Sequence, residues 1–207
     1  MTSFYDRHIM PRLIACACAS PAIMKQRQKV VPLAEGRVLE LGVGGGLNLA
    51  SYDPAKVKSV TGVDPSAELR ARAMAAPCRE GVAVEIIDGT AEALPFEAAA
   101  FDTVVCTYTL CTVCDPAQSL AEARRVLKPG GRLLFCEHGL APDPGVATWQ
   151  RRLEPMWKAL AGGCHMTRPV GSSIAAHGFQ IERLETMYLP SAPKIFGWNE
   201  WGAARPA

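Results

Sequence analysis

A glycine-rich turn over residues 40–48 carries the most specific chemical signal in the sequence. Glu40 is followed by glycines at positions 42, 44 and 46, and Asn48 closes the turn. Glycines let backbone amides approach a ligand without an intervening side chain. A dinucleotide fingerprint would place its third glycine at position 47, where the chain has Leu47. Because a carboxylate at Glu40 would repel a pyrophosphate, the turn is expected to bind a ligand that carries positive charge.

A second acid, Asp64, ends the next β-branched run and is followed by Pro65 and Ser66. A carboxylate accepts two hydroxyl hydrogen bonds, so Asp64 is expected to hold a ribose diol. A nicotinamide dinucleotide would use Asp64 in the same way. Asp64 alone therefore does not distinguish that cofactor from a ligand that carries positive charge.

The elements that must position these residues alternate between short apolar strands and helical segments. This alternation predicts an α/β fold with a parallel sheet flanked by helices. The helix that precedes the fifth strand is expected to be capped by Asp115, to begin with Pro116 and to stop at residues 129–131. The five predicted strands cover residues 37–41, 59–64, 82–87, 102–107 and 132–137, and two more are expected at 178–189 and 198–205.

The organisation of the chain is expected to be one domain over residues 1–207. Residues 1–36 are predicted to form a helical N-terminal cover that is broken by Pro11, Pro21 and Pro32. The cofactor-binding core then covers 37–140, an irregular insert on the substrate side covers 141–171, and C-terminal strands cover 172–207.

Composition excludes several classes of partner. The 207 residues carry a net charge of only +2, with basic residues scattered along the chain, so we expect no nucleic-acid partner. No apolar run approaches the ~20 residues of a membrane helix. A cytoplasmic protein with at most peripheral membrane contact is therefore expected.

The cysteines show no regular disulfide framework, and several lie inside predicted strands, which suits free thiols in a reducing compartment. Cys111 and Cys114 have the spacing of half a zinc site, and with Cys106 and Cys164 they offer a metal or metalloid site as an alternative. No second pair follows, so we expect no bound metal. The eight cysteines are residues 16, 18, 78, 106, 111, 114, 136 and 164.

The acidic residue followed by three spaced glycines resembles the first motif of the class I S-adenosylmethionine-dependent methyltransferases, in particular the type 11 group. The resemblance implies a Rossmann-like, mostly parallel seven-stranded sheet whose last strand is antiparallel. It also implies S-adenosylmethionine as cofactor and S-adenosylhomocysteine as product, with Gly42, Gly44, Gly46 and Asn48 around the methionine part and Glu40 near its ammonium group.

Residues 88–96 resemble the adenine-edge motif of the small-molecule methyltransferases. The usual acid of this motif falls on Thr90, so adenine recognition is assigned to the Ala91 amide and to Thr90 or Glu92. The remaining residues expected to bind the cofactor are Asp64, Pro65 and Ser66 after the second strand and Thr107 at the end of the fourth.

The acceptor pocket is expected at residues 4–6, 106–111 and 136–139, which lie at strand ends or in covering segments. His138 is the preferred proton acceptor because imidazole titrates in the useful range. Its alternative role is that of a hydrogen-bonded histidine that shapes the loop. Tyr5 and Glu137 are further catalytic candidates.

Segments over residues 36–170 resemble the methyltransferase-like alkyl thiol S-methyltransferases, whose animal members are membrane-anchored. These segments include Val105-Cys-Thr, Phe135-Cys-Glu-His138 and Gly163-Cys-His-Met-Thr-Arg168. The implied reaction is S-methylation of a small thiol or of sulfide. The alternatives are phosphatidylethanolamine N-methylation, arsenite methylation, and a cofactor-binding protein without catalysis.

Overall fold

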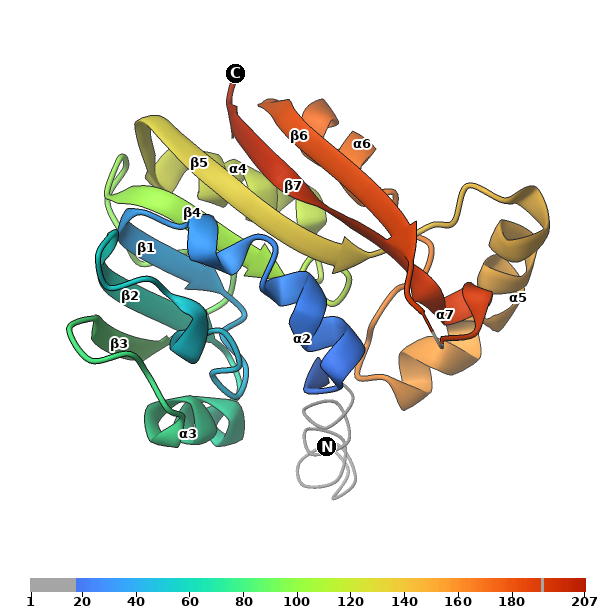
Figure 1. Ribbon diagram of the computed structural model, residues 1–207. Helices are drawn as coiled ribbons and strands as arrows, with labels where there is room; N and C mark the ends of the chain where they lie inside the picture. Colours follow the sequence, from blue (N-terminus) through green and yellow to red (C-terminus); the bar gives the residue numbers. More distant parts are fainter. Residues whose placement is uncertain (1–17, 191) are drawn as a thin grey trace.

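The computed structural model describes residues 18–190 and 192–207, which are built around one seven-stranded sheet (Figure 1). The strand order is β3-β2-β1-β4-β5-β7-β6, in which β1 to β5 are parallel and β7 runs antiparallel to both β5 and β6. This arrangement confirms the predicted Rossmann-like sheet with an antiparallel last strand. The strands are β1 (Gly36–Leu41), β2 (Val57–Asp64), β3 (Ala83–Asp88), β4 (Phe101–Thr107), β5 (Leu127–His138), β6 (Phe179–Tyr188) and β7 (Trp198–Pro206).

The central strands are buried on both faces, which explains their continuous apolar sequences. Val38 and Leu39 of β1 and Val104 and Val105 of β4 are all fully buried. A parallel strand covered on both sides needs apolar residues at every position, whereas the edge strand β3 alternates in exposure.

Helices and short segments cover the two faces. Leu120 of α4 and Ile174 of α6 join one core cluster, and both helices lie behind the sheet in Figure 1. Val31, Tyr52 and Ala73 join the cluster on the other face. The helices are α2 (Pro21–Arg27), α3 (Ala67–Ala75), α4 (Pro116–Val126), α5 (Pro144–Leu160), α6 (Val170–Ala176) and α7 (Lys194–Gly197), with 3-10 turns η2 (Val31–Leu33) and η3 (Leu49–Ser51).

Helix α4 begins as the sequence predicts. The Asp115 side chain accepts a hydrogen bond from the Gln118 backbone N–H at 3.0 Å, and Pro116 occupies the first turn. The helix ends at Val126, just before the Pro-Gly-Gly segment.

The prediction of an irregular insert over residues 141–171 is wrong, because a 17-residue helix, α5, fills much of it. Pro144 occupies the first turn, where its missing N–H costs nothing. Pro155 lies inside the helix and leaves the carbonyl of Arg151 without a hydrogen-bond donor. Both residues are exposed to water. Residues 172–207 likewise contain helical turns besides strands.

The prolines of the N-terminal cover also begin elements instead of breaking them. Pro21 and Pro32 occupy first-turn positions of α2 and η2. Pro11 lies outside the described residues. Among residues 18–190 and 192–207, no helix is both long and apolar enough to cross a membrane.

The carboxyl ends of the parallel strands bring the candidate residues to one edge of the sheet. Glu40 lies near the end of β1, Asp64 ends β2, Thr107 ends β4 and His138 ends β5. Helix α2 lies next to this edge in Figure 1. These four predicted cofactor and acceptor residues therefore lie at the same edge of the sheet.

Candidate cofactor and acceptor site

The turn after β1 needs its glycines. Gly42, Gly44 and Gly46 have φ values of 64°, 55° and 79°, a region that favours glycine. A Cβ on Gly42 would lie 2.5 Å from Thr109 Oγ1, whereas a Cβ on Gly44 would meet only the Gly42 carbonyl oxygen, at 3.9 Å. The turn is thus packed at Gly42 and open at Gly44, where a ligand can approach the backbone.

Asp64 is fixed against this turn. Its Oδ2 accepts a hydrogen bond from the Gly44 N–H at 3.0 Å, and its Oδ1 accepts one from the Ser66 N–H at 2.8 Å. Burial raises the pKa of Asp64, although both bonds act against the shift. The Ser66 hydroxyl caps α3 and Pro65 is exposed, so these two residues shape the turn beside the carboxylate.

Glu40 is almost completely buried, at 1% exposure. Asn48 Nδ2 donates to its Oε1 at 2.8 Å, and the Tyr52 hydroxyl donates to its Oε2 at 2.6 Å. Burial raises the pKa of Glu40 to about 7, against the effect of these two hydrogen bonds. A cation placed nearby would therefore strongly favour the ionised carboxylate.

Arg27 of α2 is a site residue that the sequence analysis missed. It is 6% exposed, and its Nη1 donates to Thr107 Oγ1 at 2.6 Å and to Asn48 Oδ1 at 3.2 Å. Its Nε is buried and has no hydrogen-bond partner within the described part of the chain. The guanidinium carbon lies 5.1 Å from the centre of the Tyr108 ring. Arg27 therefore brings a buried positive charge with a free donor to the ends of β1 and β4.

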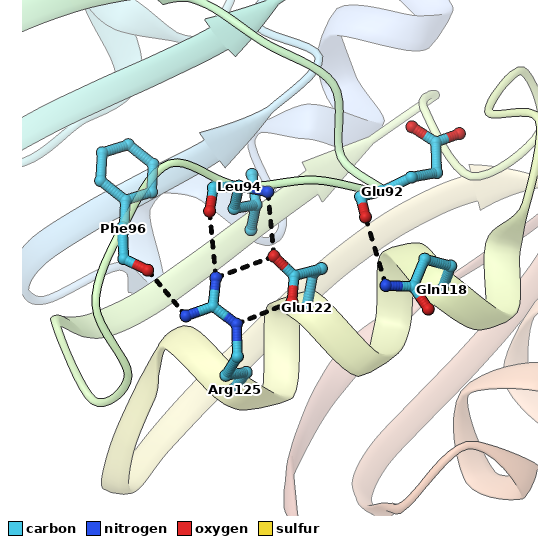
Figure 2. A network of polar contacts seen from close by, with 6 residues as sticks. All are labelled: Glu92, Leu94, Phe96, Gln118, Glu122 and Arg125. Carbon is cyan, nitrogen blue, oxygen red and sulfur yellow. Dashed lines mark hydrogen bonds and ion pairs between the residues drawn. The ribbon is translucent and has the colours of Figure 1, made fainter.

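The predicted adenine segment is fastened to α4 (Figure 2). Arg125 donates to the carbonyl oxygens of Leu94 at 3.0 Å and Phe96 at 2.7 Å. Glu122 accepts from the Leu94 N–H at 2.9 Å and pairs with Arg125. This network fixes the backbone that follows residues 90–92.

Glu92 also contacts α4 and the loop before it. Its carbonyl oxygen accepts from Gln118 Nε2 at 3.3 Å, and its carboxylate accepts from the Cys114 N–H at 2.8 Å. The side chain is thus engaged in positioning the loop. Thr90 is exposed and Ala91 is buried, which leaves the Thr90 side chain and the Ala91 backbone as the better candidates for adenine.

Glu137, a predicted catalytic residue, is fully buried and holds the loop after β4. Its carboxylate accepts hydrogen bonds from the backbone N–H groups of Thr109 at 2.7 Å, Leu110 at 3.0 Å and Cys111 at 3.3 Å. Burial raises the pKa of Glu137 to about 8. This geometry favours a positioning role over contact with an acceptor. Tyr5, the other candidate, lies outside the described residues.

His138 meets two thiols that are distant in the sequence. Its Nε2 lies 2.8 Å from Cys164 Sγ, and the ligand atoms of Cys111, His138 and Cys164 all lie within 4.8 Å of one another. A hydrogen bond from Cys164 lowers the pKa of Cys111 against the effect of burial and raises the pKa of Cys164. Cys111 is therefore grouped with Cys164 and His138, while the Cys114 side chain is exposed.

A small cavity of about 30 Å³ adjoins His138. Gln150 of α5 helps to form its wall and donates to the carbonyl oxygens of Gly139 and Ile195, each at 3.1 Å. A wider surface hollow of about 440 Å³ lies beside Glu35 and Lys58, near the amino ends of the strands and away from this edge. The α5 insert thus encloses one side of His138.

Similarity to known proteins in sequence identifies the family. Residues 39–135 match the Methyltransferase domain family. The chain is 37% identical over 172 residues to a thiol S-methyltransferase, TMT1B, of Rattus norvegicus. The match covers 79% of this chain and 70% of the relative. The chain belongs to the S-adenosylmethionine-dependent methyltransferases. Its cofactor is S-adenosylmethionine, which confirms the cofactor implied by the glycine-rich turn.

Two further comparisons support the methyltransferase fold. The chain is 38% identical over 112 residues to the phosphatidylethanolamine N-methyltransferase of Cereibacter sphaeroides, covering 53% of this chain and 54% of that one. A crystal structure of a methyltransferase from Thermotoga maritima, described as a possible histamine N-methyltransferase, superposes with a TM-score of 0.69 at 22% identity. That match covers 97% of this methyltransferase and 99% of the Thermotoga chain.

Proposed function

We propose that this methyltransferase acts on the sulfur of a small thiol or of sulfide. The observation that carries the proposal is the set of side chains that line the expected acceptor pocket, here called the acceptor wall. In the described part of the expected pocket, residues 106–111 and 136–139, Glu137 is the one carboxylate, and backbone amides engage it. A thiol with a pKa of about 8.5 needs only weak help to ionise, whereas an amine near 10 needs a strong base. The wall therefore suits a sulfur acceptor, as does the similarity to a thiol S-methyltransferase.

The reaction asks the protein for alignment and exclusion of water. Bound S-adenosylmethionine would supply the methyl group of its sulfonium to the acceptor thiolate and would leave as S-adenosylhomocysteine. The α5 insert and the walls around His138 exclude water from the acceptor. Such alignment accounts for much of the rate in a displacement of this kind.

The residues at the sheet edge fit the cofactor in both charge and shape. The open backbone at Gly44 admits it, Asp64 holds the ribose diol, and Glu40 favours the ammonium group. We assign the carboxylate of the methionine part to Arg27, since a buried guanidinium with a free Nε donor suits a carboxylate. Thr90 and the Ala91 backbone remain as the proposed adenine contacts.

His138 is retained as a proposed residue of the acceptor step because of its place at the end of β5. Its Nε2 is engaged by Cys164, so a proton reaches it only if that contact opens. We expect His138→Ala to lower turnover by more than about tenfold while cofactor affinity stays unchanged. His177→Gln, which alters a histidine at the C-terminal end of α6, is the control. Unaltered turnover in His138→Ala would remove this residue from the reaction.

A phospholipid amine is the second candidate acceptor, favoured by an apolar stripe on α5. Trp149, Met156 and Leu160 are each more than half exposed and have helical spacing. A stripe of this kind can rest on a lipid surface. The relative from Cereibacter sphaeroides has such a lipid in its name.

The test supplies labelled S-adenosylmethionine with one acceptor at a time and measures the release of S-adenosylhomocysteine. The acceptors are sulfide, small alkyl thiols, vesicles that contain phosphatidylethanolamine, and arsenite. Turnover with sulfide or thiols alone supports the proposal, whereas turnover with vesicles or arsenite alone overturns it. Tight cofactor binding without turnover on any of them would mean that the acceptor assignment is wrong.

A further inference from the structure

Two thiols and one imidazole come together near the carboxyl ends of β4 and β5. Cys111 comes from the loop after β4, His138 from the end of β5, and Cys164 from the loop before α6. Cys111 is 2% exposed and Cys164 is 9% exposed, and the three ligand atoms lie within 4.8 Å of one another. Paired buried thiols beside an imidazole are a recognised ligand set for transition metals.

We propose that Cys111, His138 and Cys164 form a binding site for Zn²⁺. Two thiolates and one imidazole are the three protein ligands of one known class of zinc site, which keeps a fourth position open. With zinc–sulfur distances of about 2.3 Å and zinc–nitrogen distances of about 2.0 Å, tetrahedral ligand atoms lie roughly 3.5 Å to 4 Å apart. The present spacing, 2.8 Å between His138 and Cys164 and no more than 4.8 Å within the trio, needs only small side-chain adjustments.

The surrounding backbone holds the two cysteine loops in place. The His165 N–H donates to the Cys111 carbonyl oxygen at 2.8 Å, which ties the Cys164 loop to the Cys111 loop. Glu137 accepts the Cys111 N–H at 3.3 Å and anchors that loop from inside. His165 is itself held by Glu154, with Nδ1 and Oε1 2.9 Å apart. Outer contacts of this kind orient metal ligands and strengthen binding.

The cavity beside His138, which Gln150, Trp157 and Met166 also line, is large enough for one small fourth ligand on the His138 side of the cluster. Its volume of about 30 Å³ exceeds what one water needs. We assign this position to water in the resting protein and to hydrosulfide or a thiolate during turnover. That second assignment rests on the proposed function; the zinc site itself does not. With the metal bound, His138 would be a ligand and not a proton acceptor.

Cobalt and zinc binding to the reduced, full-length protein tests the site without any use of turnover. We expect about one equivalent of Co²⁺ to give thiolate-to-cobalt charge-transfer absorption, and Zn²⁺ to displace it. Cys111→Ser and Cys164→Ser should each weaken Co²⁺ binding by more than about 100-fold, which is more than the loss of a contact outside the metal ligands would cause. Cys114→Ser, an exposed thiol nearby, should bind like the parent protein.

The controls separate misfolding and the acceptor question from the metal site. Each variant is first shown to bind S-adenosylmethionine with the parent affinity, which certifies its fold. Absence of cobalt absorption in the reduced parent protein overturns the inference. A loss of Co²⁺ affinity in Cys114→Ser as large as that in Cys111→Ser and Cys164→Ser overturns it as well. A disulfide between Cys111 and Cys164 that forms in air and persists under mild reduction also overturns it. Zinc binding without methylation of sulfide or thiols would support the site and refute the proposed acceptor.

Discussion

Burial of Glu40 makes the stability of the cofactor-free protein depend on pH. The pKa of Glu40 rises to about 7 in the folded protein from an ordinary value near 4.5. The folded state therefore keeps a proton that the unfolded chain has already lost between these pH values. Stability from this group is present at low pH and is lost as pH rises through about 7. Between about pH 5.5 and about pH 8 the loss is about 2 kcal/mol in the free energy of unfolding.

Glu40→Gln removes this titration while keeping the size of the side chain. We expect urea unfolding to show the parent protein losing about 2 kcal/mol more than the variant between the two pH values. Glu85→Gln, on the exposed edge strand β3, is the matched control and should follow the parent. The same pH dependence in Glu40→Gln and the parent would refute the reasoning, because burial of this carboxyl would then have no energetic effect.

Four further substitutions test the site. Asp64→Asn should weaken cofactor binding at least tenfold in calorimetry, as expected for loss of a charged ribose ligand; unchanged affinity would rule out that role. Arg27→Met should weaken cofactor binding by roughly tenfold or more, while Lys25→Met on the exposed side of α2 should not. Gly44→Ala should reduce cofactor affinity and stability together, since φ is 55° there and alanine costs about 1 kcal/mol; a normal thermal midpoint would contradict this. Glu137→Gln should lower the free energy of unfolding, measured in urea, by about 2 kcal/mol, because the amide NH2 leaves a backbone N–H of the loop after β4 without an acceptor.

The sheet and the cofactor turn could be predicted because their signals are local. Parallel strands buried on both faces have continuous apolar sequences, and glycines with positive φ leave a regular spacing. The position of Asp64 is predictable for the same reason, since it closes β2 two residues before Ser66, the N-cap of α3; its contact with the ribose remains a proposal.

The remaining features depend on contacts between distant parts of the chain. Arg27 contacts Asn48 and Thr107, which are 21 and 80 residues away, and nothing in its own segment marks it. The sequence offered Cys106, Cys111, Cys114 and Cys164 as possible metal ligands, and the fold brings only Cys111 and Cys164 of these together with His138. Helix α5 could not be predicted from a segment rich in Trp, Pro, Gly and Arg, because composition does not show that Pro144 begins the helix and that Pro155 lies on its exposed side.

Methyl transfer to sulfide tests the central claim most directly. The purified protein is given labelled S-adenosylmethionine and sulfide, and labelled methanethiol and S-adenosylhomocysteine are measured together. We expect one S-adenosylhomocysteine for each labelled methyl group found in methanethiol and its further methylation product dimethyl sulfide, saturation with sulfide, and at least tenfold less product from Asp64→Asn at limiting cofactor. Cofactor binding with no methylated sulfur product, from sulfide or from any small thiol, would contradict it.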